Sequence, residues 1–186
     1  MPQAASYRSP RLSWQPLPRR ARRPGKPMQE WLLDRGSLTS RLIAASKGEF
    51  HVEVVRQLFG VPRLDERQAL GMKRPALALI REVILFGQSE PWVFARSLLP
   101  LSSLTGTLRH LRKQGNRPLG AFLFSQPHLA RSAIAVAEIS RDHGYVPNNL
   151  VGDRLLWGRR SVFYLQQKPL LVSEVFLPAF AARLDR

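Results

Sequence analysis

Cysteine is absent from this sequence of 186 residues, which excludes disulfide bonds, thiolate nucleophiles and cysteine-based metal sites. Histidine is scarce, and its four copies show none of the HxxxH spacing that binds zinc on a helix, so we expect no metal site. No apolar run approaches the roughly 18 to 20 residues needed to cross a bilayer. The N-terminus also lacks the apolar centre of a secretory signal. These absences predict a cytoplasmic protein without a membrane span.

Acidic residues are few, 13 against 29 lysines and arginines, and the excess of positive charge is unevenly spread. Residues 1–27 contain seven basic residues, six prolines and no acid, which predicts a disordered tail. Residues 28–186 are long enough, and apolar enough, for one domain with an ordinary core. A net charge of +16 invites a nucleic-acid-binding function. Because the charge gathers in the tail and no aromatic-basic recognition pattern is present, we expect no dedicated nucleic-acid partner.

Two short helices are expected near the start of the domain, with Ser37 as the N-cap of the second. Alternating apolar residues predict three strands, at 51–58, 77–86 and 92–100. Leu104–Lys113 is expected to be helical, and Arg131–Ile139 fits a helix or a strand, its β-branched residues favouring a strand. A final hairpin, Leu155–Pro178, closes the chain. The pattern predicts an α+β fold with an antiparallel sheet.

Two charged residues interrupt apolar strands. Glu174 lies between Val172 and Phe176. Period two places Arg81 on one largely apolar strand face and its neighbour Glu82 on the other, so one of these two charges is expected to be buried. Because an unpaired buried charge is costly, each needs a partner or a purpose. One interpretation is a structural ion pair, either Arg81 with Glu174 or Arg96 with Glu82. The other is a mostly apolar pocket in which a few charges bind a small anionic ligand. The alternation of apolar residues alone does not decide between the ion pair and the ligand pocket.

Three long blocks resemble the signature blocks of bacterial chorismate pyruvate-lyases: REVILFGQSEPWVFARSLLPLSSLTG, NRPLGAFLF and LWGRRSVFYLQQKPLLVSEVFLP. The segment EWLLDRGSLTSRL resembles the first helices of the same family, and the blocks follow the family order from about Glu30 to Pro178. The resemblance implies a single α+β domain, with a six-stranded antiparallel sheet and helical flaps over a buried ligand pocket. It also implies a carbon–oxygen lyase that cleaves chorismate to 4-hydroxybenzoate and pyruvate without a cofactor, in the first step toward ubiquinone. We expect a monomer.

The resemblance also implies roles for individual residues. Arg81 matches the arginine that binds the ring carboxylate, and Glu174 matches the glutamate beside the 4-hydroxyl group. Leu119 and Leu38 match ligand contacts made through the backbone, although Leu38 replaces a methionine. Arg96 matches a further pocket-lining arginine, preceded by alanine where the family has glycine.

Several features have plainer interpretations. Trp157–Arg160 is expected to be a structural turn that enters the last hairpin, and Trp92 and Phe94 are expected in the core. The strongest rival function is a non-catalytic small-molecule sensor, because the effector domains of one bacterial transcription-factor family share this fold. Such sensors normally follow a DNA-binding domain, for which the 27 residues before Met28 are too few.

Overall fold

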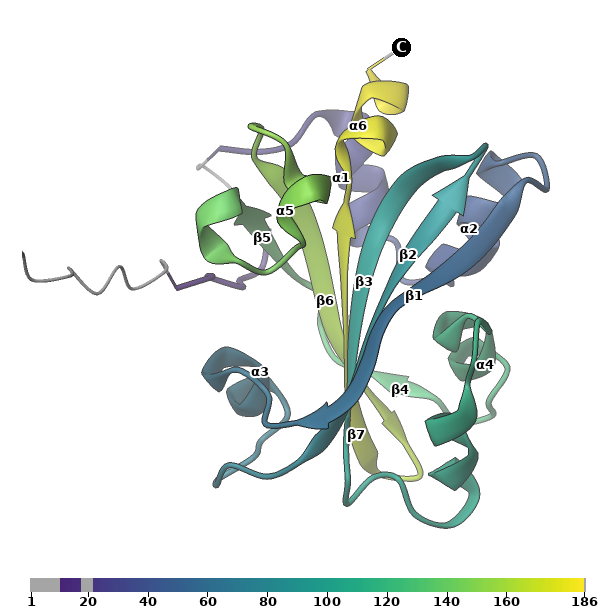
Figure 1. The fold of residues 1–186 in the computed structure, drawn as a ribbon, viewed down its shortest axis with the longest axis vertical. Helices are drawn as coiled ribbons and strands as arrows, with labels where there is room; N and C mark the ends of the chain where they lie inside the picture. Colours follow the sequence, from purple (N-terminus) through teal and green to yellow (C-terminus); the bar gives the residue numbers. More distant parts are fainter. Residues whose placement is uncertain (1–10, 18–21, 186) are drawn as a thin grey trace, which may run out of the picture.

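The computed structural model describes residues 11–17 and 22–185, and it is built around one curled antiparallel sheet (Figure 1). The sheet has seven strands, in the order β1-β2-β3-β7-β6-β4, with β5 also paired with β6. The strands are β1 Phe50–Gly60, β2 Ala78–Gly87, β3 Glu90–Pro100, β4 Ala130–Arg131, β5 Ala135–Ile139, β6 Leu156–Leu165 and β7 Lys168–Phe176. The α-helices are α1 Lys26–Leu33, α2 Leu38–Ala45, α3 Leu64–Ala69, α4 Leu119–Phe124, α5 Asn148–Val151 and α6 Pro178–Leu184. Two 3₁₀ helices, η1 Gly106–Lys113 and η2 Arg141–His143, complete the set.

Two tight hairpins form the centre of the sheet. Gln88–Ser89 joins β2 to β3 and Gln166–Gln167 joins β6 to β7, and all four of these residues have positive φ. Positive φ at both central residues of a two-residue turn matches the twist of the flanking strands. The hairpins meet where β3 pairs with β7. Both predicted hairpins are confirmed.

The predicted count of six strands differs from the seven observed, because the outer position beside β6 is divided. Residues 156–160 of β6 pair with β5, whereas Phe163 and Tyr164 pair with the two residues of β4. The sheet therefore has six positions across, and the last is filled by two short strands in series. The α+β class and the antiparallel pairing are as predicted.

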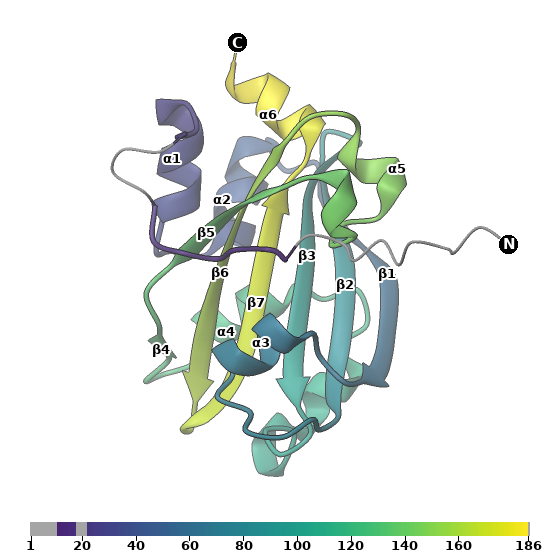
Figure 2. The same ribbon diagram turned by 90° about the vertical axis from the view of Figure 1, so that its left-hand side faces the viewer.

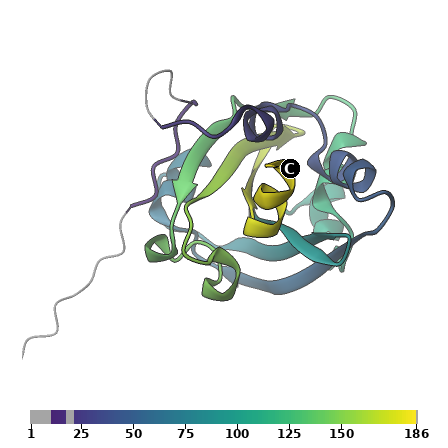
Figure 3. The ribbon, with the colours of Figure 1, turned by 90° about the horizontal axis from the view of Figure 1, so that it is seen from above.

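Helices cover the two faces of the sheet unequally. Seen from above, the sheet curls around α6, with α1 and α2 across its open side and α5 outside (Figure 3). Figure 2 shows α3 and α5 in front of the sheet, on the face away from α4. Each face carries two clusters of buried apolar side chains, and Trp92 and Phe94 are fully buried in them, as predicted.

Local helix predictions were mostly accurate. The hydroxyl of Ser37 accepts a hydrogen bond from the backbone N–H of Ser40, so Ser37 is the N-cap of α2 as predicted. The ambiguous segment at 131–139 is extended, as its β-branched residues indicated. The predicted helix at Leu104–Lys113 is a 3₁₀ helix that starts at Gly106. No helix of the described chain combines the length and apolarity that crossing a bilayer requires.

Part of the segment predicted to be a disordered tail lies against the sheet. Leu12 is buried, and Gln15 exchanges two backbone hydrogen bonds with Val136 of β5, at 3.0 and 2.7 Å. The prediction therefore does not apply to residues 11–17, because their apolar side chains and backbone cover an edge strand. Residues 1–10 and 18–21 lie outside the described residues.

Candidate functional site

A pocket lies on one face of the sheet, under the first turns of α2 and α4. Its lining residues bound about 540 Å³ of space not filled by protein atoms, part of which is open to solvent. Most of its wall is apolar and comes from the two clusters on this face. Four polar side chains interrupt that wall: Thr39, Arg81, Ser97 and Glu174. The site is therefore an apolar chamber with few, separated polar groups.

Strand register brings Arg81 and Glu174 to this face. Arg81 of β2 lies opposite Ser97 of β3, and Ser97 lies opposite Val172 of β7. Glu174 is two residues beyond Val172 and therefore points to the same side. Both predicted charges thus line one pocket, although they come from strands almost a hundred residues apart in the sequence.

Arg81 is a buried cation that has no acidic partner among the residues the structure describes. The residue is 3% exposed, and its Nη2 donates to the backbone carbonyls of Gly115 and Arg117, at 2.7 and 3.3 Å. In the described part of the chain, no carboxylate lies within ion-pair distance of it, and its buried Nε has no acceptor. Burial accordingly lowers the pKa of Arg81. A guanidinium in this state is suited to bind a carboxylate bidentately.

Glu174 has a protein partner, but it is not Arg81. The Nε of Arg159, on β6, donates to Glu174 Oε2 at 2.6 Å, and Arg159 is 1% exposed. The Nη1 of Arg159 donates to the carbonyls of Trp31 and Asp34, at 2.8 and 2.7 Å, where α1 ends. In the described residues no group donates to Glu174 Oε1, which is free to accept a hydrogen bond from a ligand.

Arg159 is a site residue that the sequence pattern did not predict. Residues 157–160 were expected to form a turn, but they are strand residues of β6, and Arg159 pairs directly with Glu174 across the β6–β7 ladder. Its burial and its carboxylate partner follow from that register. The one signal in the sequence was an arginine placed in a segment that otherwise alternates like a strand.

The two helices over the pocket begin at the predicted contact residues. Leu38 is the first residue of α2 and Leu119 the first of α4, and both line the pocket. The first backbone N–H groups of a helix have no acceptor within the helix. Both leucines can therefore offer an N–H donor to a ligand. Gly120 lets the helices meet, because a Cβ there would lie 3.0 Å from the hydroxyl of Thr39.

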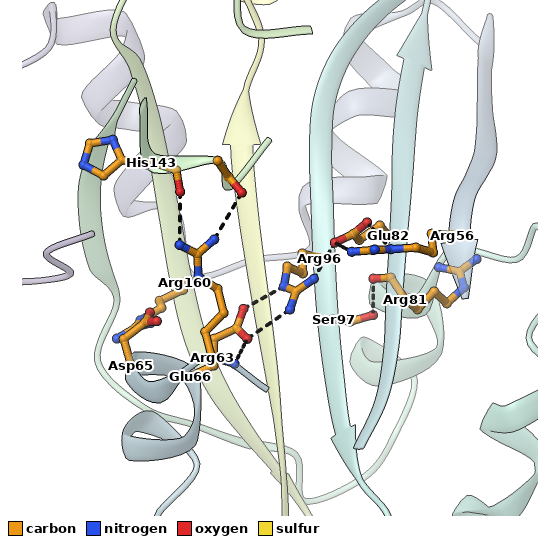
Figure 4. Close-up of polar contacts among 11 residues, drawn as sticks. Arg56, Arg63, Asp65, Glu66, Arg81, Glu82, Arg96, Ser97, His143 and Arg160 are labelled. Carbon is orange, nitrogen blue, oxygen red and sulfur yellow. Dashed lines mark hydrogen bonds and ion pairs between the residues drawn. The ribbon is translucent and has the colours of Figure 1, made fainter. Parts of the chain in front are cut away.

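Arg96 was expected to line the pocket, and this prediction is wrong. Its strand neighbours Ala95 and Ser97 face the pocket, so Arg96 points to the opposite face. There its Nε and Nη2 donate to both oxygens of Glu66, at 2.7 and 3.1 Å, and its Nη1 donates to Glu82 (Figure 4). The ion pair of Arg96 with Glu82, one of the alternatives that periodicity left open, is present. A side chain paired in this way on the far face is not available to a ligand in the pocket.

Arg56 extends this far-face network. It donates from Nε and Nη2 to the two oxygens of Glu82, both at 3.0 Å. Nearby, Arg160 is paired with Asp65 at 2.8 Å. The described residues include no cluster of three or more acidic or histidine side chains that could bind a metal ion.

Comparison with known proteins assigns the family. The chorismate lyase family profile matches residues 10–184. A probable chorismate pyruvate-lyase of Azoarcus sp. strain BH72 is 44% identical over 181 residues, covering 93% of this chain and 94% of that protein. One from Thiobacillus denitrificans is 42% identical over 156 residues, covering 82% of this chain and 83% of that protein.

Solved structures with the same fold are more distant. The effector domain of PhnF from Mycobacterium smegmatis has a TM-score of 0.54 at 15% identity, covering 79% of this chain and 91% of that domain. A GntR-family transcriptional regulator from Bacillus cereus has a TM-score of 0.51 at 13% identity, covering 70% of this chain and 93% of that protein. These likenesses concern the fold alone, whereas the sequence matches identify the family. The chain belongs to the chorismate lyase family.

Proposed function

We propose that this protein is a chorismate pyruvate-lyase, which cleaves chorismate to 4-hydroxybenzoate and pyruvate at the start of ubiquinone biosynthesis. The observation that carries the proposal is Arg81, a buried arginine with no acidic partner in the described chain, on the wall of an apolar pocket that also holds Glu174. A small ring with a carboxylate at one end and a hydroxyl group at the other matches these two groups. Membership of the family supports the choice of reaction.

The reaction balances without an external oxidant or reductant. The bond between ring carbon C3 and the enolpyruvyl oxygen breaks, and its electron pair leaves with the oxygen. The hydrogen on C4 leaves as a proton, and the electron pair of that bond completes the aromatic ring. Enolpyruvate takes up a proton at its methylene carbon and becomes pyruvate. Because aromaticity drives the process, we propose that no cofactor takes part and that positioning supplies much of the acceleration.

Each pocket group has a role in this proposal. The guanidinium of Arg81 binds the ring carboxylate, and the N–H groups of Leu38 and Leu119 offer further donors at the starts of their helices. Oε1 of Glu174 accepts a hydrogen bond from the C4 hydroxyl group, while Arg159 holds Oε2. Glu174 then orients the carbon that loses its proton.

We further propose that the protein acts in the cytoplasm as a monomer and without a nucleic-acid partner. Residues 28–186 would then contain all the groups that the reaction needs, because every residue assigned a role above lies within that range. Residues 11–17 contribute packing on the far side of β5 rather than any pocket group.

The direct test is to add chorismate and follow pyruvate through lactate dehydrogenase, with 4-hydroxybenzoate absorbance as a second readout. We expect the two products in equal amounts. The fold shared with GntR-family effector domains supports a sensor as the alternative, and a sensor would bind an aromatic carboxylate without releasing pyruvate. Binding of 4-hydroxybenzoate with no pyruvate from chorismate would therefore reject the lyase in favour of the sensor.

A further inference from the structure

A second arginine that has no acidic partner among the described residues lies near Glu174. Arg131, on β4, pairs across the ladder with Phe163, which lines the pocket. Its guanidinium carbon lies 5.0 Å from the centre of the Phe163 ring, and its Nε donates to Ser161 Oγ at 3.0 Å. Its Nη1 donates to the carbonyl of Arg35 at 2.9 Å. Arg131 therefore lies on the pocket face of the sheet, one side chain behind the pocket wall.

The charges around Arg131 do not cancel. Arg131 and Arg159 both lie near Glu174, which is at ion-pair distance from Arg159 only. Asp34 is also close, but it forms its own ion pair with Arg41 at 3.0 Å. Within the described chain, Arg131 has no carboxylate at ion-pair distance. This end of the pocket thus has a surplus of positive charge.

The pKa of Arg131 reflects this surplus of positive charge. Burial and the positive charge of Arg159 lower the pKa of Arg131 to about 10, and Glu174 offsets this only in part. The side chain stays cationic at neutral pH, but in surroundings that disfavour the charge. An anion beside it would relieve that cost.

The pocket also comes near the surface beside Phe163. Phe124 of α4 lines the pocket, is 39% exposed, and packs edge-on against Phe163 with ring centres 5.9 Å apart. The Phe163 ring lies between the pocket and the Arg131 guanidinium that it contacts, and Phe124 beside it reaches the surface. Rotation of an aromatic side chain, rather than movement of a strand, would join the pocket to the guanidinium.

We propose that Arg131 binds the second carboxylate of a dianionic substrate, while Arg81 binds the first. The inference rests on the proposed function, because chorismate carries one carboxylate on its ring and another on the enolpyruvyl group. Arg81 and Ser161, the residue that holds Arg131, share one row of the sheet on β2 and β6, three strand spacings or about 14 Å apart. The two cations thus flank the pocket. Cleavage removes the second carboxylate with pyruvate, so Arg131 favours substrate over the aromatic product.

The test compares a monoanion with a dianion of the same ring. The monoanion is 4-hydroxybenzoate, and the dianion is 3-(carboxymethoxy)-4-hydroxybenzoate, whose ether carboxylate imitates the enolpyruvyl group. Binding of both is measured by calorimetry on the full chain and on Arg131→Gln. We expect the dianion to bind about 5- to 30-fold more weakly to the variant, a modest loss because Arg131 is only half buried. Binding of 4-hydroxybenzoate should change less than about threefold.

Two further variants separate a binding role from a structural one. Arg131→Lys keeps the charge and should recover part of the preference for the dianion. Arg160→Gln is the matched control, since Arg160 is an arginine of the neighbouring strand β6 that is paired with Asp65 and faces away from the pocket. It should leave both affinities unchanged. If Arg131→Gln does not fold, the affinities of Arg131→Lys and Arg131→Met for the dianion are compared instead. Their difference still measures how far dianion binding depends on the positive charge.

The outcomes distinguish this proposal from the proposed function. Equal weakening of both ligands by Arg131→Gln, or no weakening of either, would overturn the role of Arg131 even if the protein produces pyruvate. Selective loss of the dianion supports that role, and it does so even if no pyruvate is formed, because binding is measured without turnover.

Discussion

Replacing Arg159 with methionine tests the contact between Arg159 and Glu174, which distinguishes this pocket from a simple anion site. The variant removes the partner of Glu174 and also leaves the carbonyls of Trp31 and Asp34 without their donor. Methionine fills much of the same volume, so the cavity left behind is small. The effect should therefore come from the lost polar contacts.

The magnitude follows from the burial of the pair. The side chain of Arg159 is 2% exposed and that of Glu174 is 16% exposed, so water replaces little of the lost interaction. Removing one member of a buried ion pair costs about 3 to 5 kcal/mol of unfolding free energy. For a chain of this length, each kcal/mol shifts the melting temperature by about 2 to 4 °C, so we expect a fall of roughly 6 to 20 °C. Turnover should fall as well, since Glu174 is no longer held in one orientation.

A double-mutant cycle assigns the loss to the pair. If Glu174 is the main partner of Arg159, Arg159→Met combined with Glu174→Gln should be less destabilised than the sum of the two single variants. Arg160→Met is the matched control, and its more exposed pair with Asp65 should cost only about 1 to 2 kcal/mol. Chemical denaturation measures all four variants. Additive effects, or a cost for Arg159→Met no larger than that of the control, would refute this reasoning.

Three further predictions concern the ligand and the N-terminal segment. Arg81→Ala should weaken 4-hydroxybenzoate by roughly 30- to several-thousand-fold in calorimetry, because the ring carboxylate loses its buried partner; unchanged affinity would place that carboxylate elsewhere. Glu174→Gln should lower turnover and weaken 4-hydroxybenzoate more than benzoate, which has no hydroxyl group to lose, and equal weakening would argue for a purely structural role. Deleting residues 1–17 should lower the melting temperature, because Leu12 and the backbone pairing of Gln15 are lost, but pyruvate production should stay within about threefold.

Local features of the fold were readable from the sequence, and the partners of buried charges were not. The cap at Ser37 and the two hairpins depend on residues close together in the chain, where turn and capping chemistry decide the outcome. The partner of Glu174 depends on the register between β6 and β7, which the sequence pattern does not specify. For this reason an ion pair with Arg81 was considered and Arg159 was overlooked.

The error over Arg96 has a similar physical origin. Along a strand, a shift of one residue moves a side chain from one face of the sheet to the other. The family resemblance assigned Arg96 to the pocket, whereas the alternative ion pair with Glu82 required it to share a face with Glu82. The structure has that ion pair. Likewise, the proline content of the first residues predicted disorder, yet composition does not reveal that Leu12 and Gln15 have an uncovered strand edge within reach.

The ion-pair network on the far face of the sheet places no net charge behind the ligand pocket. Two arginines, Arg56 and Arg96, face two glutamates, Glu66 and Glu82, so the group is electrically neutral. Only the backbone of β3 separates it from the pocket, since Ala95 and Ser97 lie on one side of that strand and Arg96 on the other. A charge change behind the sheet would therefore be felt by an anion in front of it, across a medium that screens poorly. Replacing Glu66 with a neutral residue would leave one positive charge there without a partner. We therefore expect an aromatic anion to bind more tightly in the pocket, while the fold becomes less stable.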